Sequence, residues 1–149
     1  MSPSRIRPTA PRLLREERGV TLIELLVVLI IIGLLAAIVI AAFTTQQNKA
    51  HDADAKTHAR SAQTAMESYF VEHKTYAGVT RADLEVEQTS LKDAPALAIV
   101  TATSNEYEIE TSSTSTDPVT FSVHRLPTGT IDRSCSPAGT GGCKPGGVW

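Results

Sequence analysis

The sequence predicts an α+β protein in which a long N-terminal helix packs on a small antiparallel β-sheet. Three observations predict this fold class. An almost unbroken apolar run covers residues 20–43, a helical pattern without glycine or proline continues to residue 77, and short strand-like segments follow it. At 149 residues, the chain has room for one spanning helix and one small outer domain, and it is too short for a large enzyme with a deep cleft.

Residues 1–19 form a basic leader. They hold five arginines against two acids, whereas residues 20–149 hold nine basic and fourteen acidic residues. Because Lys and Arg beside a spanning segment stay on the cytoplasmic side, we expect residues 44–149 to lie outside the membrane. The acidic remainder also argues against a nucleic-acid partner, because phosphate recognition needs clustered Lys or Arg.

Residues 20–43 predict a transmembrane helix. They span about 36 Å as a helix, more than the roughly 30 Å of a hydrocarbon core and more than an ordinary signal peptide needs. Glu24 is the one carboxylate in this run, and a carboxylate inside a bilayer is a functional-site hypothesis because it is costly without a partner. Two alternatives remain open. A cleaved secretory signal leaves Gly19 and Glu24 unexplained, and a plain signal anchor treats Glu24 as snorkelling to the headgroups.

Residues 44–77 are expected to continue the helix as an amphipathic half. Apolar side chains recur there at spacings of four and three residues, at Ala55, Ala59, Ala62, Met66 and Tyr69. Such a stripe indicates a face that packs on a core, and we interpret Met66, Tyr69 and Phe70 as core residues. The segment Thr75–Gly78 is expected to end the helix, with Gly78 as a left-handed cap.

Residues 78–149 are expected to form a β-sheet head. A variable connection through residues 92–95 precedes the first strand. Predicted strands cover 97–102, 107–110 and 120–124, where apolar residues cluster or alternate with period two. Between the last two strands, residues 111–118 are rich in Ser and Thr and predict a solvated hairpin loop.

The only two cysteines, Cys135 and Cys143, enclose a Pro/Gly-rich loop near the end of the chain. The expected topology places them in an oxidising compartment, which favours a disulfide. Closing a loop of this length stabilises the fold by roughly 2.5 kcal/mol in the chain-entropy description. Trp149 is expected to anchor the tail against the domain.

The sequence shows no motif for catalysis or for metal binding. Asp54 and His58 share a helix face, but no third ligand accompanies them, and no calcium loop, phosphate loop or nucleophile elbow is present. We therefore expect no catalytic residue, no metal and no cofactor, and we expect the protein not to be an enzyme.

The segment Arg18–Glu24 and the apolar run after it resemble the N-terminal signature of the type IV pilin and type II secretion pseudopilin superfamily. The resemblance implies peptidase cleavage between Gly19 and Val20 and N-methylation of the new amine on Val20. Valine stands where the family usually has phenylalanine or methionine, and the proline that kinks many of these helices is absent near residues 41–42. The residues to which the resemblance gives a role in assembly are Glu24, Leu22, Ile23 and Leu25.

The resemblance implies a pilin-like fold and a structural subunit of a type IV pilus-like filament used for adhesion, motility or DNA uptake. The implied partners are further subunits in a homo- or hetero-filament, a prepilin peptidase, an inner-membrane assembly platform and, before assembly, the membrane. The implied location is the inner membrane, crossed once with the C-terminus outside, and then a filament at the cell surface.

The resemblance also yields a hypothesis for how neighbouring subunits are aligned in the filament. Glu24 of an incoming subunit pairs with the Val20 amine of its neighbour, because either charge alone is costly to bury. Two alternatives to a pilus subunit remain. One is a pseudopilin of a type II secretion system, in which a disulfide-closed C-terminal region is less typical. The other is a membrane-anchored binding module that never polymerises.

Overall fold

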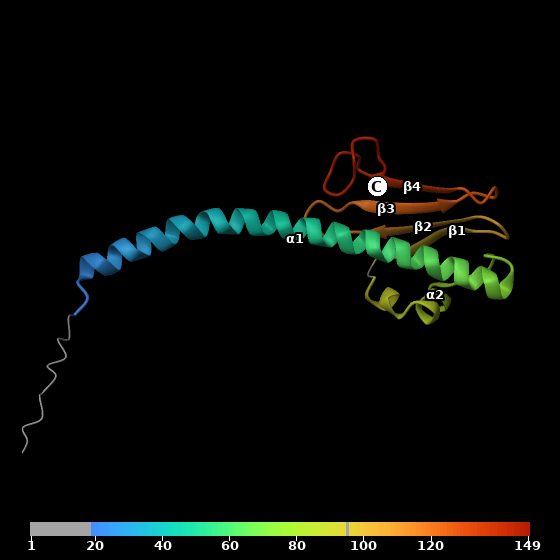
Figure 1. The fold of residues 1–149 in the computed structure, drawn as a ribbon, viewed down its shortest axis with the longest axis horizontal. Coiled ribbons are helices and arrows are strands. Elements are labelled where there is room, and N and C mark those ends of the chain that lie inside the picture. The colour runs from blue at the N-terminus through green and yellow to red at the C-terminus, as the bar shows by residue number, and fades with distance from the viewer. Residues whose placement is uncertain (1–18, 95) are drawn as a thin grey trace, which may run out of the picture. The chain divides into compact units, whose positions relative to one another are not determined.

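The computed structural model describes residues 19–94 and 96–149, without the side chain of Ala41. Residues 1–18 of the predicted leader therefore lie outside the described residues. The chain divides into two compact units with the boundary between Ile38 and Val39. Helix α1 (Leu22–His73) begins in the first unit and ends in the second (Figure 1).

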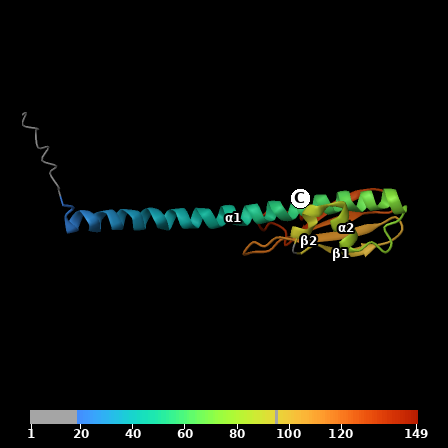
Figure 2. The ribbon, with the colours of Figure 1, turned by 90° about the horizontal axis from the view of Figure 1, so that it is seen from below.

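The second unit combines the later part of α1 with a four-stranded antiparallel sheet, which confirms the predicted fold class. The strands follow one another in the order β1-β2-β3-β4. Figure 2 shows α1 running along this sheet. The remaining elements are α2 (Arg81–Glu87), the 3-10 helix η1 (Thr89–Asp93), β1 (Ala98–Ala102), β2 (Tyr107–Ser112), β3 (Thr120–Arg125) and β4 (Ile131–Ser136).

The core lies between α1 and the sheet, on the face that the helical spacing predicts. Ala59 and Ala62 of α1 are fully buried, and their small side chains let the helix lie close to the sheet. Met66 is also fully buried, as predicted, whereas Tyr69 and Phe70 are only partly buried at the edge of the core. On the sheet side, residues of alternate positions point inward, as period two requires. These buried strand residues include Tyr107, Ile109, Phe121 and Val123.

Helix α1 ends earlier than the sequence predicts. Its last residue is His73, and the left-handed residue that follows is Lys74 (φ 59°), not Gly78. The cause is Tyr76, whose fully buried ring stacks on Phe70 and meets Tyr107 edge to face. The chain must leave the helix before this ring to turn it into the core. Gly78 (φ 83°) serves the next turn instead.

Two short helices replace the variable connection that was expected before the sheet. Thr80 and Asp83 form a reciprocal capping box at the start of α2. Leu84 of α2 and Leu91 of η1 are fully buried. Arg81 fastens the segment by donating from Nη2 to the carbonyl oxygen of Ala94 at 2.8 Å.

The three predicted strands are present, and β2 extends two residues further than predicted, to Ser112. The fourth strand, β4, was not predicted. It lies at the sheet edge, and its middle residues, Asp132, Arg133 and Ser134, are all exposed. An edge strand of this kind lacks the apolar alternation on which strand prediction depends.

The loop predicted over residues 111–118 is solvated only in part. Thr114, Thr116, Asp117 and Pro118 are exposed, but several of its hydroxyls bind α1. Thr111 donates to the carbonyl oxygen of Ala55 at 2.8 Å. Further along, Thr114 Oγ1 contacts His51 Nδ1 at 3.0 Å, and Asn48 Nδ2 donates to Thr116 Oγ1 at 2.7 Å. Two serines of the loop, Ser113 and Ser115, are buried. The loop is therefore fixed to the helix by side-chain hydrogen bonds.

Candidate functional site

Helix α1 begins with a reciprocal cap formed by Thr21 and Glu24. The backbone N–H and the hydroxyl of Thr21 both donate to Glu24 Oε2, at 2.9 and 2.8 Å. The backbone N–H of Glu24 in turn donates to Thr21 Oγ1 at 3.2 Å. This is the arrangement of a capping box, which satisfies backbone donors that the first helical turn leaves without a partner.

Sequence reasoning missed this cap, although the Thr-x-x-Glu pattern at 21–24 signals it. The structure brings Glu24 to Thr21 of its own chain. The predicted contact of Glu24 with the Val20 amine needs a cleaved chain and, in the assembled form, a neighbour. That pairing stays a prediction.

The first unit exposes its apolar side chains along the helix. The predicted assembly residues Leu22, Ile23 and Leu25 are 82, 68 and 58% exposed. Helix α1 is long and apolar enough to cross a membrane, with a mean hydropathy of 3.4 over its most apolar window, none of which is buried within the chain. Such a surface is unstable in water, so the helix needs lipid or other helices around it.

The two glycines of the first unit are not required by contacts within the chain. A Cβ added at Gly19 or at Gly33 would meet nothing within 4 Å among the described residues. Gly33 lies inside a helix, where glycine costs roughly 1 kcal/mol relative to alanine. In membranes, small residues permit close helix–helix packing, whereas no contact among the described residues accounts for a glycine at this position.

The predicted disulfide is present and joins Cys135 of β4 to Cys143. The loop that it closes is held on α1 by Asp52, which is buried and accepts from the backbone N–H of Gly142 at 2.7 Å. Lys56, one turn later, donates to the carbonyl oxygen of Gly142 at 2.7 Å. Both backbone polar groups of Gly142, its N–H and its carbonyl oxygen, are therefore hydrogen-bonded to side chains of α1.

Trp149 anchors the end of the chain, as the sequence predicts. Its indole N–H donates to the carbonyl oxygen of Ser122 at 3.2 Å, and its ring meets Phe121 edge to face at 5.7 Å. The guanidinium groups of Arg60 and Arg133 lie 5.5 and 5.8 Å from the ring centre. Cation–π attraction of this kind holds arginines against an aromatic face.

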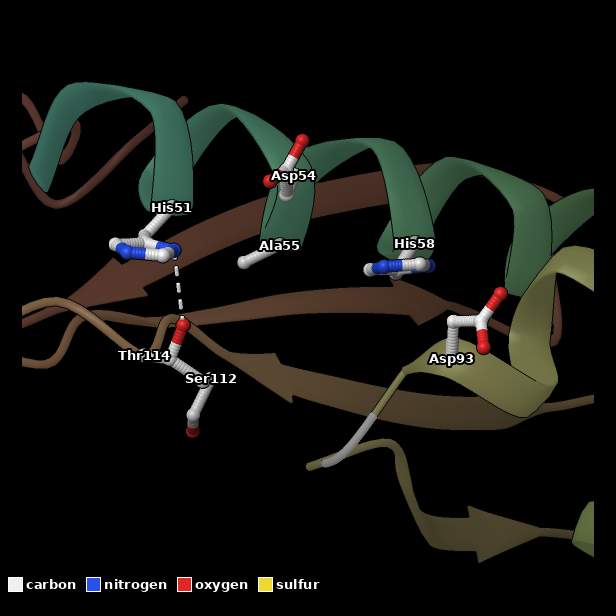
Figure 3. A pocket seen from close by; sticks show the side chains of 7 residues that line it. All are labelled: His51, Asp54, Ala55, His58, Asp93, Ser112 and Thr114. Carbon is white, nitrogen blue, oxygen red and sulfur yellow. Dashed lines mark hydrogen bonds between the residues drawn. The ribbon is translucent and has the colours of Figure 1, made fainter. Parts of the chain in front are cut away.

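A cavity of about 150 Å³ lies beside α1 (Figure 3). His51 and His58 face it from the helix, and Asp93 lies across from His58, so the structure adds two residues to the Asp54–His58 pair noted in the sequence. Nδ1 of His58 is buried, with no hydrogen-bond partner among the described residues. Within residues 19–94 and 96–149, no group of three or more His, Cys, Asp or Glu is placed to hold a metal ion.

Two buried tyrosines share one carboxylate near the end of α1. Tyr76 and Tyr107 each donate to a different oxygen of Glu67, both at 3.0 Å, and Arg125 pairs with Glu67 at 3.3 Å. Burial first, and then the hydrogen bond to Glu67, raise the pKa of Tyr76 to about 12. Burial also raises the pKa of Tyr107. This group joins the helix to β2 and β3.

Comparison with known proteins places the start of the chain in a described family. The family model "Prokaryotic N-terminal methylation motif" matches residues 14–40. No solved structure matches the chain.

Two curated relatives match larger parts of the chain. The type IV major pilin protein PilA of Myxococcus xanthus is 44% identical over 62 residues, which cover 42% of this chain and 28% of that protein. The type IV wide pilus major component PilA4 of Thermus thermophilus is 32% identical over 97 residues, which cover 63% of this chain and 72% of that protein. The chain thus spans little more than a quarter of the first relative and most of the second.

Proposed function

Because the chain belongs to the type IV pilin family, we propose that it is a pilus subunit that is processed at its N-terminus and assembled through α1. The observation that carries the proposal is an apolar helix that starts at the Thr21–Glu24 cap and offers its side chains to partners outside the chain. The names of both relatives, which are main components of type IV pili, support it.

The proposed cleavage site is the bond between Gly19 and Val20. The family match spans this bond, since it runs from residue 14 to residue 40. A glycine before the bond leaves a protease unhindered, and the open space around Gly19 means that the fold itself does not require glycine there. A prepilin peptidase is the proposed partner in this step, and N-methylation of the Val20 amine is the proposed step after it.

Cleavage creates an ammonium on Val20, one residue before the helix cap. In the described part of the chain, both bonds from Thr21 end on Oε2 of Glu24, so Oε1 is the oxygen we assign to the ammonium of a neighbouring subunit. The two charges neutralise each other, whereas either alone is costly in an apolar filament core. Leu22, Ile23 and Leu25, all exposed in the single chain, supply the surrounding packing.

Before assembly, the subunit is proposed to sit in the inner membrane. The apolar part of α1 spans the membrane, the basic leader stays in the cytoplasm and the sheet domain lies outside. An inner-membrane assembly platform then moves the subunit into a filament at the cell surface. The role is structural, in agreement with relatives that are named as pilus components.

The experiment that tests this proposal is N-terminal sequencing with intact mass on protein from membranes and from sheared surface material of the native host. A chain that begins at methylated Val20 and occurs in sheared filaments is the expected result. The same chain confined to membranes, together with a secretion defect on deletion, would assign it to a type II secretion system. A chain that keeps its leader would refute processing and support a plain membrane anchor.

A further inference from the structure

Two side-chain groups of opposite charge lie on different sides of the second part of α1. The first, here called the arginine–tryptophan cluster, consists of Arg60, Arg133 and Trp149. It lies where β4 meets α1, because Arg133 donates to Gln63 Oε1 at 2.8 Å. Both arginines are exposed, and neither pairs with a carboxylate in the described part of the chain.

The second group, here called the carboxylate pocket, lies where α2 meets α1. It is a hollow of about 170 Å³ lined by Tyr69, Glu72, His73, Asp83, Val86 and Glu87. Figure 1 shows α2 and β4 on opposite sides of α1. The carboxylates of Glu72 and Glu87 are exposed, with no cationic partner among the described residues, whereas Asp83 is occupied by Thr80.

The chemistry of the two groups is complementary. An arginine guanidinium can donate two parallel hydrogen bonds to one carboxylate, and it can also stack on an aromatic ring. The carboxylate pocket offers both features, because the rings of Tyr69 and His73 are stacked at 4.0 Å along its wall. Its rim also carries Val86, an apolar side chain that is 79% exposed. The pocket can therefore bind an arginine in three ways: through ion pairs with its carboxylates, through stacking on its aromatic rings and through apolar contact with Val86.

From this arrangement, we propose that the arginine–tryptophan cluster of one subunit docks into the carboxylate pocket of a second copy of this chain. The inference rests on the proposed filament and names a contact between the sheet domains that the apolar helix does not supply. Two different patches on one chain make a head-to-tail contact, which builds an open filament when the rotation does not close. Arg60 and Glu72 lie about three helical turns apart along α1, so the neighbour is shifted along the helix axis.

The test replaces the wild-type gene in the native host and measures filament yield after shearing. One variant reverses the cluster (Arg60→Glu with Arg133→Glu), and a second reverses the pocket (Glu72→Arg with Glu87→Arg). A third variant carries all four changes, which restores opposite charges across the contact with the signs exchanged. Asp132→Arg serves as the control, because Asp132 is exposed on β4 but lies outside both groups.

Each two-site variant is expected to lower the filament yield at least about tenfold, because like charges then face each other. The four-site variant and the control are expected to give filaments near the wild-type yield. Two-site variants that assemble like the wild type would overturn the contact, and so would a four-site variant that stays as low as they do while its processed form remains abundant in the membrane.

A neutral variant guards against misfolding of the reversed variants. Arg60→Gln with Arg133→Gln keeps side chains of polar character, and its filaments are expected to lose subunits several times faster after shearing than wild-type filaments. Equal loss rates would also overturn the contact. A wild-type chain that forms no filament would refute the filament proposal itself, which separates that failure from a failure of this contact.

Discussion

The carboxylate of Asp52, near the middle of α1, accepts a 2.7 Å hydrogen bond from the backbone N–H of Gly142, in the disulfide loop ninety residues later. Asp52 is buried, and its other oxygen lies 3.4 Å from Ser115 Oγ. One helical side chain thus positions both the loop between β2 and β3 and the loop closed by Cys135 and Cys143.

Replacing Asp52 with alanine is expected to destabilise the fold. The N–H of Gly142 loses its acceptor in a partly buried site, which costs on the order of 1–3 kcal/mol. Thermal unfolding of the full chain in detergent measures the loss. Asp54→Ala is the matched control, because Asp54 is exposed two residues away. Equal unfolding temperatures for the two variants would show that Asp52 does not hold the loop.

Gly142→Ala is expected to be destabilising by about 1–3 kcal/mol through crowding. A Cβ at this position would lie 3.0 Å from Lys56 Nζ and 3.1 Å from Asp52 Cβ. Gly146→Ala is the control, since its nearest neighbour would be 3.9 Å away, and it is expected to change stability by less than about 1 kcal/mol. Chemical denaturation of both variants checks the difference. A harmless Gly142→Ala would mean that the loop does not approach the helix this closely.

The raised pKa of Tyr76 predicts a loss of stability in alkali. The folded chain holds the phenol proton up to a pKa of about 12, whereas an unfolded chain releases it near 10. The unfolded state therefore binds fewer protons between these values, so stability falls as the pH rises through them. Unfolding curves from pH 9 to about 12 measure the slope. Tyr76→Phe should reduce the slope without abolishing it, because burial also raises the pKa of Tyr107, and an unchanged slope would assign the effect to other groups.

Gly19→Leu is expected to block processing without harming the fold. Among the described residues, nothing lies within 4 Å of a Cβ added at Gly19, so we expect the substitution to affect the peptidase and not the fold. Immunoblots of membranes should show the full-length form accumulating, with a loss of the processed form of at least about tenfold. Gly33→Ala serves as a control with equal space but no place at the bond. Efficient processing of Gly19→Leu would move the cleavage site elsewhere.

Much of the fold follows from hydrophobic periodicity. The stripe through Ala59 and Met66 and the alternation through Tyr107 and Ile109 place the helix and the central strands, because these residues are fully buried. Hydrophobic periodicity does not predict segments that are exposed and held by polar contacts. Strand β4 lies at an edge and is mostly exposed, so it lacks an apolar signal.

The parts of the candidate site that sequence reasoning missed depend on contacts between distant residues. Thr114 and Ser115 read as a solvated turn because only the folded chain brings them to His51 and Asp52. The cap formed by Thr21 and Glu24 is local, and its pattern was available in the sequence. A single carboxylate in an apolar run fits a partner in another chain as well as a local cap, so the pattern alone does not decide between the two.

The most direct measurement of the central claim is the filament yield of Glu24→Val beside that of Thr21→Val. Both changes break the reciprocal cap at the start of α1, because Thr21→Val removes the hydroxyl and Glu24→Val removes its acceptor, but only Glu24→Val removes the carboxylate. We expect both chains to be processed, with filaments from Thr21→Val near the wild-type yield and filaments from Glu24→Val lower by at least about tenfold. Normal filaments from Glu24→Val would contradict the proposal that Glu24 pairs with the Val20 amine during assembly.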